Sequence, residues 1–165
     1  SRLHRVLEAQ LALDRVEGVR CAFNDHHGIV GLELLREEIA DESIDLGGVT
    51  VAAVGGLHAV IHRDIPQVGN VGLVVRAEGE PTLFQPGDSL AAVPSGIDVL
   101  CLPAHGPWAA MKEHIDFGRA VGAPRGFLVH DGLLSERGCH LAFGRLGEMC
   151  RMELRDLRDG IPWDV

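Results

Sequence analysis

The chain has 165 residues, 46% hydrophobic and 24% charged, proportions that are typical of a folded globular protein and argue against a disordered one. Its formal net charge of −9 argues against nucleic acid as a partner, because the surface would on average repel a polyanion. No apolar run approaches the roughly 20 residues that a membrane-spanning helix needs, so we expect no membrane contact.

Hydrophobic periodicity and turn residues divide the chain into helices and strands, with no linker between them. Apolar residues three and four positions apart indicate helices, alternating ones indicate strands, and Gly47-Gly48 is typical of a hairpin turn. The first predicted elements are a helix over 2–15, a strand over 19–23, a helix that follows Asn24-Asp25, and strands over 44–46, 49–54, 71–76, 81–84 and 97–102. They are followed by a helix whose inner face carries Trp108, Met111, Ile115 and Val121. The last elements are a strand over 126–129, a helix over 136–150 and a strand over 152–157. Hairpins mixed with strand–helix units predict one α/β domain over residues 1–165, with two packed sheets and helices outside.

The four cysteines (Cys21, Cys101, Cys139 and Cys150) form no Cys-x-x-Cys pair. They lie in apolar runs or on one face of a predicted helix, which indicates buried free thiols and a reducing compartment. No charged-then-apolar leader opens the sequence, so we expect a cytoplasmic protein.

Three apolar strands are each followed by a side chain that can bind a metal. His58 follows the strand over 49–54, Asp88 follows the second hairpin, and His130 follows the strand over 126–129. Imidazole and carboxylate groups are the usual ligands of a hydrolytic dication, and strand ends hold such groups rigidly. The three residues are too far apart in the sequence to form a local motif, so two loop histidines and a turn aspartate are the alternative interpretation.

The segments around these residues resemble motifs of one protein family. The chain is similar to the later two-thirds of a metallo-β-lactamase-fold hydrolase, of the branch that includes ascorbate-phosphate-lactonase-like proteins. The matching segments, in the order of the family, are Gly55-Gly-Leu-His-Ala, Pro86-Gly-Asp-Ser, Ile97-Asp-Val-Leu-Cys-Leu-Pro and Phe127-Leu-Val-His-Asp-Gly.

This resemblance implies an αββα sandwich that is incomplete at the N-terminus. It also implies a metal-dependent hydrolase in which a metal-bound hydroxide attacks an ester, a lactone or a phosphoester of a small-molecule substrate. Asp88 would then be the catalytic bridging ligand between two metals, with His58 and His130 as outer ligands. Zn²⁺ is the expected divalent metal, although Mn²⁺ and Fe also suit these side chains.

The family signature His-x-His-x-Asp-His is absent from this sequence, and Asn24-Asp-His-His-Gly has the right residue types at the wrong spacing. We therefore expect Ser1 to follow the signature, which leaves a partial ligand set, weak metal affinity and an open sheet edge. A homo-oligomer, such as a symmetric dimer, or another partner would cover that edge. The chain is alternatively a catalytically inactive truncated relative that acts as a binding or assembly module, or the retained part of a longer enzyme.

Four further residues are candidates for binding substrate: His62, His105, Trp108 and Asp131. His62 lies four positions after His58, in a predicted loop over 58–69, and a plain loop histidine is its alternative. His105 follows a strand end near the expected site, and a turn histidine is the alternative. Trp108 would form a pocket wall or anchor its helix in the core, and Asp131 would orient His130 or the substrate, or form a turn.

Overall fold

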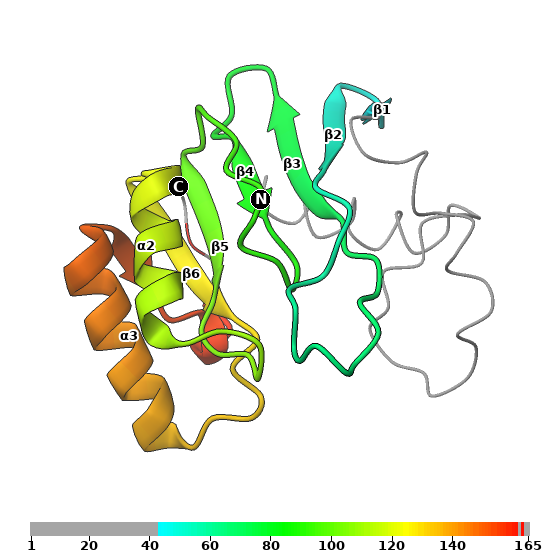
Figure 1. Cartoon of the computed structure of the whole chain (residues 1–165). Helices are drawn as coiled ribbons and strands as arrows, with labels where there is room; N and C mark the ends of the chain where they lie inside the picture. Colours follow the sequence, from blue (N-terminus) through cyan, green and yellow to red (C-terminus); the bar gives the residue numbers. More distant parts are fainter. Residues whose placement is uncertain (1–42, 162, 164–165) are drawn as a thin grey trace.

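The computed structural model describes residues 43–161 and 163 (Figure 1). The strands are β1 (Ser43–Asp45), β2 (Val49–Val54), β3 (Gly72–Ala77), β4 (Leu83–Gln85), β5 (Val99–Pro103), β6 (Arg125–Val129) and β7 (Glu153–Arg155). The helices are α2 (Met111–Val121), α3 (Glu136–Cys150) and the 3₁₀ helix η2 (Leu157–Asp159). The predicted helix over 2–15, strand over 19–23 and helix after Asn24-Asp25 lie outside the described residues, as does Cys21.

One mixed sheet contains all seven of these strands, in an order that follows the chain. The pairs from β1 to β4 are antiparallel, and the pairs from β4 to β7 are parallel. Two antiparallel pairings separate β2 from β4, so β2, β4, β5 and β6 run in the same direction and their carboxyl ends share one edge of the sheet. The loops that follow β2, β5 and β6 lie at this edge, at the lower end of the sheet in Figure 1.

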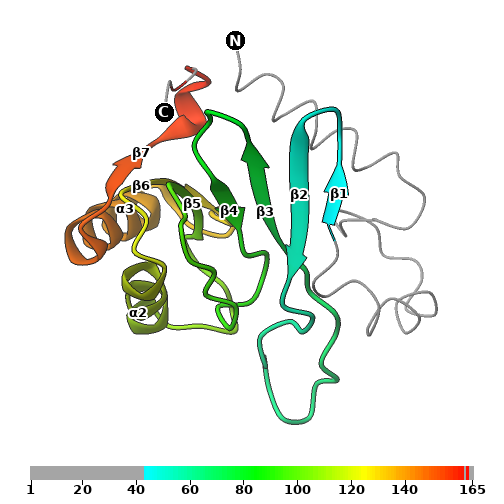
Figure 2. The same ribbon diagram turned by 90° about the horizontal axis from the view of Figure 1, so that it is seen from above.

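Helices α2 and α3 pack side by side against one face of the sheet (Figure 2). The core on this face includes Phe84, Leu100, Leu102, Phe117 and Leu146. Every residue of β5 is buried, as is typical of a central strand in a parallel sheet. A second apolar cluster of Val51, Leu73 and Val75 lies on the opposite face, because side chains alternate along β2 and β3. The described residues thus supply one sheet of the expected αββα sandwich together with its helix layer, and that sheet is apolar on both faces.

Local sequence explains where the helices begin and end. At the start of α2, the Glu113 carboxylate accepts a hydrogen bond from the Ala110 amide (2.6 Å), and Gly122 ends the helix in the left-handed region. At the start of α3, the Ser135 hydroxyl accepts from the Gly138 amide (3.2 Å). The observed range of α3 is the predicted one, 136–150.

Both predicted hairpins are confirmed, and the predicted strand over 152–157 is shorter, at Glu153–Arg155. The prediction for the inner face of α2 is confirmed for Val121, which is buried, and for Ile115, which packs against the core, and it is wrong for Trp108 and Met111. Trp108 lies before the helix, because the chain turns there and the Ala109 amide donates to the Gly106 carbonyl (3.3 Å). The buried side of α2 carries His114, Phe117, Gly118 and Val121, whereas Met111 is 36% exposed.

The buried thiols also agree with the sequence. Cys101, Cys139 and Cys150 are free and buried. Burial raises the pKa of the Cys101 and Cys150 thiols, so both remain protonated at neutral pH. Within the described residues, no helix has the length and apolar character needed to cross a membrane.

Candidate functional site

Three of the predicted site residues meet at the edge where the parallel strands end. The Asp88 carboxylate lies between two imidazoles and faces each of them with a different oxygen. Its Oδ2 is 3.6 Å from Nε2 of His58, and its Oδ1 is 3.3 Å from Nε2 of His130. The loops after β2, β4 and β6 bring these three side chains together, since all three strands end at the same edge. We call His58, Asp88 and His130 the His–Asp–His cluster.

Asp88 is held in place by a side chain from the loop before β3. The Asp88 amide donates to Oδ1 of Asn70 (2.8 Å), and Nδ2 of Asn70 donates to the Pro86 carbonyl (3.0 Å). Gly87, between them, has a φ of +67°, and a Cβ at that position would collide with the Asn70 amide. Asn70 therefore fixes the turn that presents the Asp88 carboxylate.

The backbone contacts of His58 determine which ring nitrogen carries its proton. Nδ1 of His58 lies 2.6 Å from the Ala59 carbonyl oxygen, which can only accept, so Nδ1 is the donor. In a neutral ring, Nε2 then has a free lone pair that faces Asp88. The Ala59 amide also donates to the Asp88 carbonyl (3.0 Å), which ties the loop over 58–69 to the turn that carries Asp88.

His130 has an unusual backbone conformation. Its φ is +57°, in the left-handed region that side chains other than glycine seldom occupy. The residue follows directly after β6, whose last carbonyl, of Val129, accepts from the Ala104 amide (2.7 Å). Such strain costs on the order of 1–3 kcal/mol and persists where surrounding contacts impose it, often at functional sites. Here the left-handed turn accompanies an imidazole that points at Asp88.

The donor atoms of the cluster suit a divalent cation. The Nε2 lone pair of His58 and a carboxylate oxygen are both acceptors, so their 3.6 Å approach favours a proton or a metal ion between them. Two ligand atoms on one tetrahedral Zn²⁺ lie about 3.4 Å apart, given bond lengths of about 2.1 Å. Both cluster distances are close to that value. In the described part of the chain, however, no group of three or more His, Cys, Asp or Glu side chains is arranged to hold a metal ion by itself. The three residues of the cluster therefore do not form a complete metal site by themselves.

Trp108 contacts the cluster from the turn before α2. Its indole ring meets the imidazoles of His58 and His130 edge-on, with ring centroids 6.0 and 6.4 Å apart. Gly106 makes this position of the ring possible, because a Cβ there would collide with the indole. Trp108 thus forms one side of the site rather than a part of the helix core.

A further histidine, His114, lies behind Trp108 and was not singled out from the sequence. His114 is only 1% exposed, and its ring stacks against Trp108 at a centroid distance of 5.6 Å. Its Nδ1 donates to the Ala110 carbonyl (3.0 Å), and its Nε2 is buried without a hydrogen-bond partner. Burial lowers the pKa of His114, which keeps this imidazole neutral. No motif marks His114 in the sequence, and its burial follows from the packing of α2 against the sheet.

The two histidines proposed to bind substrate, His62 and His105, form no ion pair with the His–Asp–His cluster among the described residues. His62 is exposed on the loop over 58–69, where its Nδ1 lies 3.5 Å from the carboxylate of Asp64. His105 is half-buried in the segment after β5. Their proposed roles in substrate binding stay predictions.

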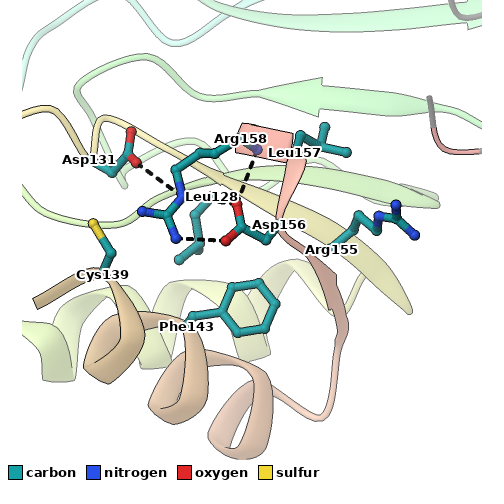
Figure 3. Close-up of a pocket in the computed structure, with 8 residues that line it drawn as sticks. All are labelled: Leu128, Asp131, Cys139, Phe143, Arg155, Asp156, Leu157 and Arg158. Carbon is teal, nitrogen blue, oxygen red and sulfur yellow. Dashed lines mark hydrogen bonds and ion pairs between the residues drawn. The ribbon is translucent and has the colours of Figure 1, made fainter. Parts of the chain in front are cut away.

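Asp131 forms an ion pair with the C-terminal segment, and its proposed role beside His130 or the substrate stays a prediction. Its Oδ2 lies 4.0 Å from Nε of Arg158, and the Arg158 guanidinium also contacts Asp156 at 2.6 Å (Figure 3). Hydrogen bonds from Arg158 lower the pKa of Asp156 to about 2. The cavity beside these residues has a volume of only about 20 Å³, which has room for little more than a water molecule.

A larger cleft, of about 410 Å³, opens beside His58. The loop after β2, the segment after β4 and the start of α2 form its walls. Its apolar lining includes Leu57, Val60, Leu90, Ala91 and Trp108, and we call it the apolar cleft. His58 borders the cleft and also belongs to the His–Asp–His cluster, so the cleft and the cluster adjoin each other at this residue.

No family model matches the sequence. Among curated proteins, the chain is 37% identical over 120 residues to protein Rv0786c of Mycobacterium tuberculosis (strain ATCC 25618 / H37Rv), an alignment that covers 72% of this chain and 56% of that protein. Among solved structures, it is similar to a protein named as a metal-dependent hydrolase from Parabacteroides distasonis ATCC 8503, with a TM-score of 0.56, 16% identity and coverage of 71% of this chain and 55% of the other.

A further structural relative is the metallo-β-lactamase fold protein YhfI from Bacillus subtilis, with a TM-score of 0.50, 13% identity and coverage of 74% of this chain and 52% of YhfI. The chain thus spans about half the length of the proteins that it matches. Because the sequence identities to the solved structures are low, these similarities establish the fold, and the activity has to be argued from the site.

Proposed function

The described chain has the metallo-β-lactamase fold, and we propose that it forms part of a metal-dependent hydrolase whose site contains His58, Asp88 and His130. The observation that carries this proposal is the Asp88 carboxylate between two imidazole Nε2 atoms. The Nδ1 hydrogen bond of His58 supports it, because a backbone carbonyl at one ring nitrogen leaves the other free for a metal.

In this proposal, His58 and His130 would bind the metal through Nε2. One oxygen of the Asp88 carboxylate faces each imidazole, and each oxygen could serve as a further ligand. A bound dication would lower the pKa of water toward ~7 and polarise the bond to be cleaved. The protein holds the ligands in place through Asn70 and the strained turn at His130, and Trp108 shields one side of the cluster. Zn²⁺ is the first candidate, with Mn²⁺ and Fe as the other two.

Metal content tests this proposal. The purified chain is reconstituted with Zn²⁺ or Mn²⁺, dialysed and measured by elemental analysis, with an intact mass from the same sample. We expect Asp88→Asn to lose most of the bound metal, because it removes the negative charge between the imidazoles at nearly constant volume. Asp64→Asn, on the exposed part of the loop, is the matched control and should keep it. Equal metal content in wild type and Asp88→Asn would overturn the proposal.

The alternative is a non-catalytic binding or assembly module, for which the partial ligand set is the supporting observation. It predicts a chain that takes up no metal on reconstitution and that forms a tight homodimer. Sedimentation of the same samples at micromolar concentration distinguishes the two proposals. A monomer that binds near-stoichiometric metal would rule the alternative out.

A further inference from the structure

The lining of the apolar cleft indicates which kind of substrate can bind, which the His–Asp–His cluster alone does not. Three separate segments of the chain line the cleft, and its volume of about 410 Å³ is in the range of small-molecule sites, roughly 300–1,000 Å³. His58 lines it directly. The chemical character of the cleft therefore determines which part of a substrate can lie beside Asp88.

The charges around the cleft argue against an anionic substrate group inside it. None of its described lining residues is Lys or Arg. The charged carboxylate in its wall, that of Glu113, already accepts a hydrogen bond from the Ala110 amide. Away from the end of the cleft at His58, where the metal is proposed to bind, a phosphate would lose its water without gaining the cationic donors that usually compensate.

The loop that forms one wall of the cleft also exposes large apolar side chains. Exposed large apolar side chains are concentrated in the loop over 57–69, at Leu57, Val60, Ile61, Ile65 and Val68. Scattered apolar side chains on a surface are ordinary, but a contiguous group that borders a cleft marks a binding surface. Leu57 and Val60 belong to both the loop surface and the cleft wall, so the two form one apolar surface.

We propose that the apolar cleft binds an uncharged acyl or alkyl chain, which selects apolar carboxylic esters or lactones over phosphoesters as substrates. This inference rests on the proposed hydrolase function for the reaction itself. In that reaction the acyl–oxygen bond breaks, and water supplies a hydroxyl group to the acyl carbon and a hydrogen to the leaving alcohol. The chain of the acyl group lies along Leu57, Val60 and Leu90, and the ester group lies beside His58.

A binding measurement tests the cleft independently of activity. The probe is N-phenyl-1-naphthylamine, an uncharged dye that fluoresces in apolar surroundings, and the competitor is 2-nonanone. The variant Leu57→Lys/Val60→Lys adds two charges to the cleft at side chains that are already 51% and 63% exposed, so the fold tolerates them. The control, Leu133→Lys/Leu141→Lys, makes the same change at positions that are 75% and 56% exposed and lie outside the cleft.

We expect the dye to bind to wild type and to the control, to be displaced by 2-nonanone, and to bind at least about tenfold more weakly to the cleft variant. Absence of dye binding to wild type, or equal binding to all three proteins, would overturn the inference about the cleft.

Hydrolysis by the metal-loaded chain is measured separately. The substrates are p-nitrophenyl acetate, p-nitrophenyl octanoate and bis(p-nitrophenyl) phosphate. The cleft predicts that kcat/KM for the octanoate exceeds that for the acetate by roughly tenfold or more, because added methylene groups become buried. Dye binding without hydrolysis of any substrate would refute hydrolysis by this chain on its own and leave the apolar cleft supported. A preference for the phosphodiester, without dye binding, would support the hydrolase and overturn the inference about its substrate.

Discussion

Replacing Asn70 tests whether the turn that carries Asp88 is fixed by one side chain. Asn70→Ala removes two hydrogen bonds, one from the Asp88 amide to Oδ1 and one from Nδ2 to the Pro86 carbonyl. Each such bond contributes about 0.5–1.5 kcal/mol net, so the free energy of unfolding should fall by about 1–3 kcal/mol. Loss of a group that positions a ligand typically weakens metal binding by about 10–100-fold, and the same loss is expected here.

The assay is urea unfolding followed by circular dichroism, together with metal titration of the folded protein. Asn70→Asp is the informative companion: it keeps an oxygen for the Asp88 amide but places a second acceptor oxygen against the Pro86 carbonyl, so it should also be less stable than wild type. Glu78→Ala, in the exposed turn between β3 and β4, should change the free energy of unfolding by less than about 0.5 kcal/mol. If Asn70→Ala also stays within that limit and binds metal like wild type, the turn is fixed by other contacts.

Three more predictions concern buried groups near the site. Burial lowers the pKa of His114 from its usual 6.5, so the unfolded chain binds the proton more readily than the folded one. The free energy of unfolding is therefore unaffected above pH 6.5. At pH values below 6.5 it falls, by at most about 1.4 kcal/mol per pH unit. His114→Leu should remove this part of the pH dependence in urea unfolding, and an unchanged slope would contradict it. Gly106→Ala should lower the free energy of unfolding by about 1–3 kcal/mol and change the near-UV spectrum of Trp108, because the added Cβ collides with the indole. The control is Gly144→Ala in α3, which has open space around it and should not destabilise the protein. Cys101 should resist iodoacetamide at pH 7.5 in the native state and react after unfolding, since burial raises the pKa of its thiol. Rapid labelling of Cys101 in the native protein, located by mass spectrometry, would contradict this prediction and show that β5 is accessible.

Local patterns in the sequence were sufficient for much of the fold. The turn at Gly47-Gly48, the continuous apolar run of β5 and the stripe of α3 depend on neighbours within a few residues, so their elements could be predicted. The face of α2 could not, because Trp108 continues the helical spacing although the turn at Gly106 keeps it outside the helix. Periodicity alone does not show where a helix begins.

The candidate site divides in the same way. The sequence by itself determined that His58, Asp88 and His130 each follow an apolar strand, because that relation is local to each strand. Only the tertiary structure decided that the two imidazoles face different oxygens of one carboxylate, that Asn70 holds the turn, and that the neutral His114 is buried behind Trp108. Those relations join residues far apart in the chain, and they depend on the direction and order of strands in the sheet, which no local pattern contains.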